Sequence, residues 1–186
     1  MEKKQSIEKY VEWQKKQYSQ KQKLLFLAKQ EFFHLLVMPL MLFLIAWLLD
    51  KALNLYEILP HTTIILLGSI LLLICGLSLS LWTRWIQFKI GQGTPAPQMP
   101  TQKLIIKGSY KYCRNPMILG DVMWLIGLGA LLNSLSFILI SIFWFVLHLL
   151  YYKFMEEKEL IARFGQEYLE YKKRVGFLTP KFNRKN

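Results

Sequence analysis

The sequence predicts an all-α polytopic membrane protein, and three observations carry this prediction. Hydrophobic residues make up 53% of the 186-residue chain. They gather in four long segments with little charge, and basic residues gather in alternate connections between these segments. A chain of this length is expected to form a single domain, 1–186. The four apolar segments are residues 32–49, 64–82, 117–132 and 135–152.

Each apolar segment is predicted to cross the membrane as a helix. A helix rises 1.5 Å per residue, so about 20 residues are needed to cross a hydrocarbon core of about 30 Å. Segment 117–132 is the shortest and contains Asp121, and only Asn133-Ser134 separates it from 135–152, which indicates a tight helical hairpin. The alternative, buried core helices of a water-soluble protein, would leave too few polar faces to solvate the chain.

The distribution of lysine and arginine predicts the orientation. From the N-terminus, the five regions outside the spans contain eight, one, six, none and nine of these residues. The positive-inside rule then places both termini in the cytosol. No cleavable signal peptide is recognised. We expect an integral multi-pass protein, in a bacterial inner membrane rather than in the endoplasmic reticulum.

The arm 1–31 is predicted to be a basic helix at the membrane interface. Its lysines alternate with aromatic and aliphatic side chains, a composition that binds anionic headgroups. The net charge of +12 is therefore assigned to the membrane surface and not to nucleic acid.

Other signals are weaker or negative. The three histidines and two cysteines lie apart and lack zinc or disulfide spacing, so no metal site is predicted. Gly127 and Gly129 lie in an apolar helix with no preceding strand, which favours close helix packing over a dinucleotide-binding turn. The glycines and prolines of 91–100 predict a loop.

Two polar stretches are the candidate functional segments. In 108–120 (GSYKYCRNPMILG), Pro116 is predicted to begin a helix, because the first helical turn needs no amide donor. Past the last span, the helix is predicted to carry Tyr152 and Glu156 on one stripe and to stop at Gly165. A second cytosolic helix would then fold back as a lid. We expect the two stretches to meet on one side of the membrane.

Together these stretches resemble a known family. The pattern G-x-Y-x-x-x-R-x-P, followed by E-E-x-x-L-x-x-x-F-G-x-x-Y-x-x-Y-x-x-x-V, is similar to that of the isoprenylcysteine carboxyl methyltransferase family, over residues 94–180. The resemblance implies a membrane methyltransferase that uses S-adenosyl-L-methionine on a lipophilic small-molecule or lipid-like acceptor. The alternatives are a small-thiol or phospholipid methyltransferase, an NADPH-dependent membrane reductase of related helical build, and a non-catalytic membrane protein.

The resemblance also implies site residues, which lie in segments 94–120 and 153–180. Glu156 is expected to hold the cofactor and accept a proton, while Arg114 pairs with the cofactor carboxylate or with Glu156. Tyr152 is the expected substrate contact, at a position where the prenylcysteine enzymes have arginine. The family also usually has histidine in place of Asn115 and tyrosine in place of Ile118. The expected cofactor contacts are Gln102, Lys103, Leu104, Ile105, Tyr110, Asn115, Pro116, Met117, Ile118, Glu156 and Glu157.

Overall fold

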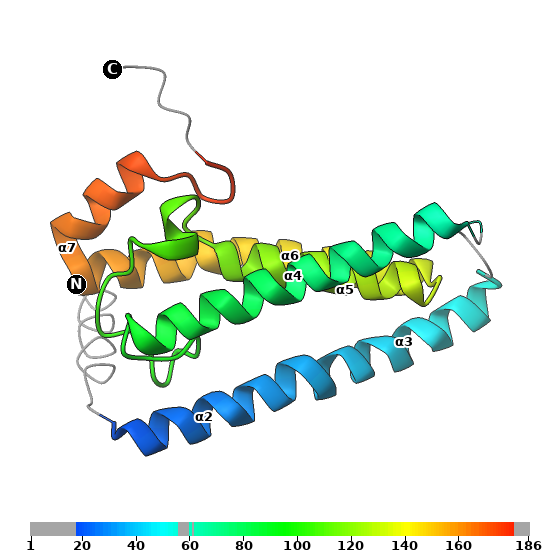
Figure 1. Ribbon diagram of the computed structural model, residues 1–186, viewed down its shortest axis with the longest axis horizontal. Helices are drawn as coiled ribbons and strands as arrows, with labels where there is room; N and C mark the ends of the chain where they lie inside the picture. The colour runs from blue at the N-terminus through cyan, green and yellow to red at the C-terminus, as the bar shows by residue number, and fades with distance from the viewer. Residues whose placement is uncertain (1–17, 56–59, 61, 181–186) are drawn as a thin grey trace. The chain divides into compact units, whose positions relative to one another are not determined.

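The computed structural model describes residues 18–55, 60 and 62–180. Most of the predicted interfacial arm, residues 1–17, lies outside these ranges. Within them the regular elements are helical, apart from one isolated β-bridge (Figure 1). In chain order they are α2 (Gln20–Phe32), η1 (Phe33–Val37), α3 (Met38–Leu53), α4 (Thr63–Lys89), η2 (Gly108–Lys111), α5 (Pro116–Leu131), α6 (Leu135–Tyr151), η3 (Tyr152–Glu156) and α7 (Glu157–Arg174).

Three continuous helices are long and apolar enough to cross a membrane. They are Gln20–Leu53, Thr63–Lys89 and Leu135–Arg174. The all-α polytopic prediction is therefore confirmed. The remaining predicted span corresponds to α5, a shorter apolar helix of 16 residues. At 1.5 Å per residue, such a helix is about 24 Å long, less than the hydrocarbon core. Four crossings thus remain a prediction.

The first long helix has no break where the predicted arm gives way to the predicted span. Helices α2 and α3 are joined by the π-helical turn η1, in which the amide of Met38 donates to the carbonyl oxygen of Phe33, five residues earlier. Pro39 follows directly and has no amide hydrogen of its own. The wider turn is one known way for a helix to accommodate a proline.

The chain divides into two compact units. The first unit consists of the described residues up to 29 together with 82–116 and 149–180, and the second consists of the described residues of 30–81 and 117–148. Helix α4 contributes its beginning to the second unit and its end, from Trp82, to the first. Each unit is described separately below.

Glycines bring helix backbones into direct contact in the second unit. A Cβ atom on Gly76 of α4 would lie 2.3 Å from the backbone nitrogen of Trp124 in α5, and one on Gly127 would lie 2.6 Å from that of Leu73. The prediction of close packing at Gly127 and Gly129 is confirmed. Beside these contacts lies a buried cluster of Met38, Leu42, Ala46, Trp124, Leu125 and Phe137.

The predicted hairpin between α5 and α6 is also confirmed. Asn133 adopts a positive φ of 54°, and the Ser134 hydroxyl oxygen accepts the amide of Phe137 at 3.1 Å, which caps the start of α6. Asp50, near the end of α3, accepts the Ser134 hydroxyl and the Ser136 amide, the latter at 3.1 Å. This carboxylate therefore ties α3 to the hairpin.

We predict that Gly76→Ala lowers the free energy of unfolding by about 1–3 kcal/mol, because the new methyl group would collide with backbone atoms that cannot move aside independently. The matched control is Gly68→Ala in the same helix, where no atom lies within 4 Å of the new Cβ. The control should leave stability unchanged or raise it slightly. Thermal unfolding of both variants in detergent measures the difference, and equal melting temperatures would contradict the packing argument.

Candidate active site

The two candidate stretches meet in the first unit through a short parallel pairing. Cys113 and Gly176 form the β-bridge, the amide of Arg114 donates to the Gly176 carbonyl oxygen at 2.9 Å, and the amide of Asn115 donates to that of Phe177 at 3.2 Å. The Asn115 side chain donates to the same Phe177 oxygen at 3.2 Å. Helix α5 begins at Pro116, as predicted. The predicted meeting of the two stretches is confirmed.

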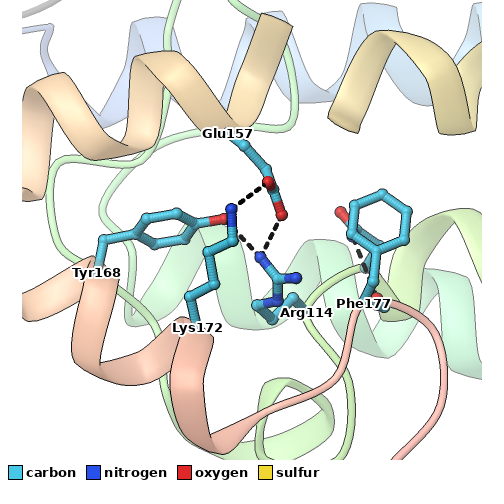
Figure 2. A network of polar contacts seen from close by, with 6 residues as sticks. Arg114, Glu157, Tyr168, Lys172 and Phe177 are labelled. Atoms are coloured by element: carbon cyan, nitrogen blue, oxygen red, sulfur yellow. Dashed lines mark hydrogen bonds and ion pairs between the residues drawn. The ribbon is translucent and has the colours of Figure 1, made fainter. Parts of the chain in front are cut away.

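An ion-pair network locks this pairing in place (Figure 2). The guanidinium of Arg114 donates to one carboxylate oxygen of Glu157, and Lys172 donates to the other at 2.6 Å. Arg114 also donates to the Tyr168 hydroxyl at 3.1 Å and lies 5.5 Å from the centre of the Phe177 ring. The side chains of Arg114 and Glu157 are only 9% and 12% exposed. The network is thus largely withdrawn from solvent.

A glycine makes this network possible. Gly165 interrupts α7 with φ 53° and ψ −127°, backbone angles that strongly favour glycine, so the helix changes direction there (Figure 1). The predicted stop at Gly165 is confirmed. The part of α7 after it brings the two buried tyrosines, Tyr168 and Tyr171, to the 108–116 segment and Lys172 to Glu157.

Arg114 pairs with Glu157 and not with Glu156, the partner considered from the sequence. The physical reason lies in η3, where the amide of Glu157 reaches the carbonyl oxygen of Tyr152, five residues earlier. One extra residue in a turn rotates the residues after the turn by about 100° relative to those before it. This wider turn cannot be recognised in the apolar pattern, so the sequence could not decide between the two adjacent carboxylates.

Glu156 is left in a different electrostatic environment. It is partly buried, and its helix has already left the apolar segment 135–152. Burial raises the pKa of Glu156 to about 8, the charges of Glu159 and Glu157 add to the rise, and Arg163 opposes it. No side chain within the described ranges donates a hydrogen bond to this carboxylate. Close to neutral pH, Glu156 can therefore both hold and release a proton.

Tyr110 lies in a buried polar cluster at the end of α4. Gln87 donates to its hydroxyl oxygen, and the Tyr171 hydroxyl donates to its carbonyl oxygen at 2.7 Å. Burial raises the pKa of Tyr110, which keeps the phenol protonated. Arg84 lies next to this cluster and is 3% exposed. From the sequence it was one of the six basic residues between the second and third predicted spans, and no role in the site was predicted for it. This cluster could have been predicted from the spacing of Thr83, Arg84 and Gln87, which places three polar side chains on one face of a helix.

The predicted loop 91–100 is compact, and the residues that follow it bond to Gly91, its first residue. The amides of Gln102 and Lys103 donate to the Gly91 carbonyl oxygen at 2.6 and 3.2 Å, and the Thr94 amide donates to that of Met99 at 2.7 Å. Among the expected cofactor contacts on this side, Gln102 and Lys103 are exposed, Leu104 is half-buried and Ile105 is 5% exposed. The exposed polar residues Gln102 and Lys103 are thus followed closely in the chain by the buried side chain of Ile105.

The structure brings most of the expected site residues into the first unit. Met117 and Ile118 are buried in the first turn of α5 and are counted with the second unit. Tyr152 is half-buried in η3 and packs edge-on against Tyr151 at 5.7 Å. No group of three or more potential metal ligands occurs among the described residues.

Comparison with known proteins gives matches that include part of the candidate site. Residues 64–167, more than half of the chain, match the model of the family described as phospholipid methyltransferase. A protein of Saccharomyces cerevisiae named protein-S-isoprenylcysteine O-methyltransferase is 43% identical over 84 residues, which cover 41% of this chain and 32% of the yeast protein. The chain thus spans about a third of this curated relative's length. No solved structure matches the chain. These matches confirm the resemblance inferred from the two motifs.

We predict that Glu157→Gln destabilises the fold, because it leaves Arg114 buried without its counter-ion. The loss should be about 2–3 kcal/mol, less than the roughly 3–5 kcal/mol of a fully buried pair, because Arg114 and Glu157 are still 9% and 12% exposed. Glu167→Gln, an exposed position on the same helix, is the control and should change little. Thermal unfolding in detergent provides the measurement. A melting temperature equal to that of the control would show that the network does not stabilise the fold.

Proposed function

Because this chain belongs to the phospholipid methyltransferase family, we propose that it is an S-adenosylmethionine-dependent methyltransferase of the membrane that acts on a lipophilic acceptor. The observation that supports this most is the Glu157 network, which holds the 108–116 segment against the helix that carries Glu156. Apart from Met117 and Ile118, the expected cofactor contacts on the two segments belong to this one unit, as an enzyme with a site built from separate segments requires.

The residues present fit this cofactor. A partly buried carboxylate that receives no side-chain hydrogen bond from the described residues calls for a cation, and S-adenosylmethionine carries both a sulfonium and an ammonium group. The Nε–H group of Arg114 is buried and has no hydrogen-bond partner in the described part of the chain, so it can reach an additional carboxylate. The bound cofactor would supply an electrophilic methyl group.

The roles of the chain's own residues follow from this geometry. Glu156 would orient the cationic donor, and Arg114, fixed by Glu157, would bind the cofactor carboxylate. The cofactor would supply its methyl group to the acceptor and would leave as a neutral sulfide that keeps the electron pair of the methyl–sulfur bond. A thiol or amine acceptor also loses a proton, which Glu156 accepts. In the cofactor-free protein the pKa of Glu156, about 8, is close to that of a thiol, about 8.5.

Residues 166–174 act as a lid in this proposal. They follow the positive-φ residue Gly165, and Tyr168 and Tyr171 attach them to the 108–116 segment. An aromatic cover excludes water from the transfer. Such a cover also suits an acceptor that arrives from the lipid.

The acceptor is proposed to be neutral or thiol-bearing and lipophilic. Tyr152 stands where the prenylcysteine enzymes have arginine, and a phenol compensates an incoming carboxylate with one neutral hydrogen bond, worth about 1 kcal/mol net. Arg114 is already engaged by Glu157, and in this proposal its remaining Nε–H group is used by the cofactor carboxylate. A carboxylate entering a membrane-edge site would thus lose hydration without gaining a new cation.

The proposed orientation has both termini in the cytosol, with the lysines of the N-terminal arm against anionic headgroups. It rests on the alternation of basic residues along the chain. In this arrangement both candidate stretches face the cytosol, where S-adenosylmethionine is made.

We predict that the purified protein binds S-adenosylmethionine, and that the affinity rises with pH up to about 8 and then levels off. The sign follows because a cation favours the ionised form of Glu156, so below pH 8 binding must release a proton from it. Glu156→Gln should weaken binding and flatten the pH dependence, whereas the exposed Glu170→Gln should change neither. Calorimetry at several pH values measures both effects. Absence of heat, together with stabilisation by NADPH, would favour the reductase alternative.

We predict that a farnesylcysteine analogue with a free carboxylate is a poor acceptor. A hydrophobic thiol or a phosphatidylethanolamine should be methylated faster in parallel assays. Tyr152→Arg should raise turnover of the farnesylcysteine analogue selectively, because it restores a cation. Efficient turnover of that analogue by the unaltered protein would overturn the proposed acceptor class.

A further inference from the structure

Arg163 joins α7 to the loop that precedes the expected cofactor contacts. Its guanidinium donates to the carbonyl oxygen of Thr101, and its charged centre lies 4.9 Å from the centre of the Phe164 ring. The side chain is half-buried. Residues 163 and 101 are 62 positions apart in the chain, so this is a tertiary contact between two elements of the first unit.

The loop that receives this contact is already closed on itself. The Gln102 side chain donates to the Pro100 carbonyl oxygen at 2.8 Å, and a Cβ atom on Gly93 would lie 2.3 Å from that same oxygen. The loop is therefore tightly folded internally, and Thr101 belongs to its rigid part. A single strong bond at Thr101 can thus fix the position of the whole loop, including Gln102 and Lys103.

Arg163 and Glu156 share one helix face. They are seven residues apart, which in a regular helix leaves an offset of about 20°. Helical side chains lean towards the N-terminus, so the long arginine side chain extends in the direction of Glu156. The two residues interact electrostatically, since the charge of Arg163 lowers the pKa of Glu156 against the effect of burial.

We propose that Arg163 is a positioning residue that holds loop 91–105 against the face of α7 carrying Glu156, so that the two sets of cofactor contacts keep one arrangement. The inference rests on the proposed function and deepens it. It explains why an arginine is half-buried one turn past Glu159. Its contact with Thr101 can also be tested in the protein without cofactor.

The first experiment measures amide hydrogen exchange of residues 101–105 in the cofactor-free protein. Arg163→Gln should accelerate exchange about tenfold, because it removes a charged hydrogen bond worth somewhat more than 1 kcal/mol. Arg163→Lys should restore part of the protection, and Lys158→Gln, exposed on the same helix, should exchange like the unaltered protein. Unchanged exchange in Arg163→Gln would overturn the proposal.

The second experiment measures S-adenosylmethionine affinity as a function of pH. The charged groups that shift the pKa of Glu156 are Glu159, Arg163 and Glu157 on its helix, and Glu156 also interacts electrostatically with Tyr110 and Tyr168. Arg163→Gln should weaken binding and move the pH midpoint upwards, whereas Arg163→Lys should keep the midpoint.

The two experiments together distinguish failure of the positioning role of Arg163 from failure of the proposed cofactor. Faster exchange with unaltered affinity and midpoint would reduce Arg163 to a structural contact and overturn its positioning role. Absence of binding by the unaltered protein would reject the proposed cofactor, and with it the positioning role, while the exchange result would still judge the Thr101 contact.

Discussion

The carboxylate of Glu157 is the group on which the rest of the site depends. It accepts Arg114 from one stretch and Lys172 from the other, and only 12% of its side chain is exposed. Burying a guanidinium without a counter-ion costs several kcal/mol, so the two stretches are stable in this form only when they meet. Tyr168, the bridge at Cys113 and the bend at Gly165 all serve the same meeting.

The adjacent carboxylates of Glu156 and Glu157 are thereby held in different environments. Glu157 is neutralised by two cations, whereas Glu156 lacks a hydrogen-bond donor in the described residues and has a raised pKa. Environment, not residue type, therefore distinguishes the carboxylate that pairs with two cations from the one that we propose to take part in the chemistry. The π-helical turn η3 changes the helical register at the start of α7, so that Glu157 and not Glu156 meets Arg114.

The second unit obeys a different constraint. Helices surrounded by lipid gain little from the hydrophobic effect when they associate, so their contacts depend on close van der Waals packing. Gly76, Gly120 and Gly127 allow α4 and α5 to touch through their backbones. Asp50 adds a polar tie at the α5–α6 hairpin, where an uncapped helix start would otherwise expose unsatisfied amides.

The sequence by itself determined the features that depend on neighbours within a few residues. These are the apolar helices, the helix start at Pro116, the hairpin at Asn133-Ser134, the break at Gly165 and the family of the two motifs. Only the tertiary structure decided that Glu157 and not Glu156 binds Arg114, that Arg84 is buried, and that Arg163 reaches Thr101. The reason is physical. These contacts join positions 43 and 62 residues apart, and their register depends on a wide helical turn that leaves no periodic signal in the chain.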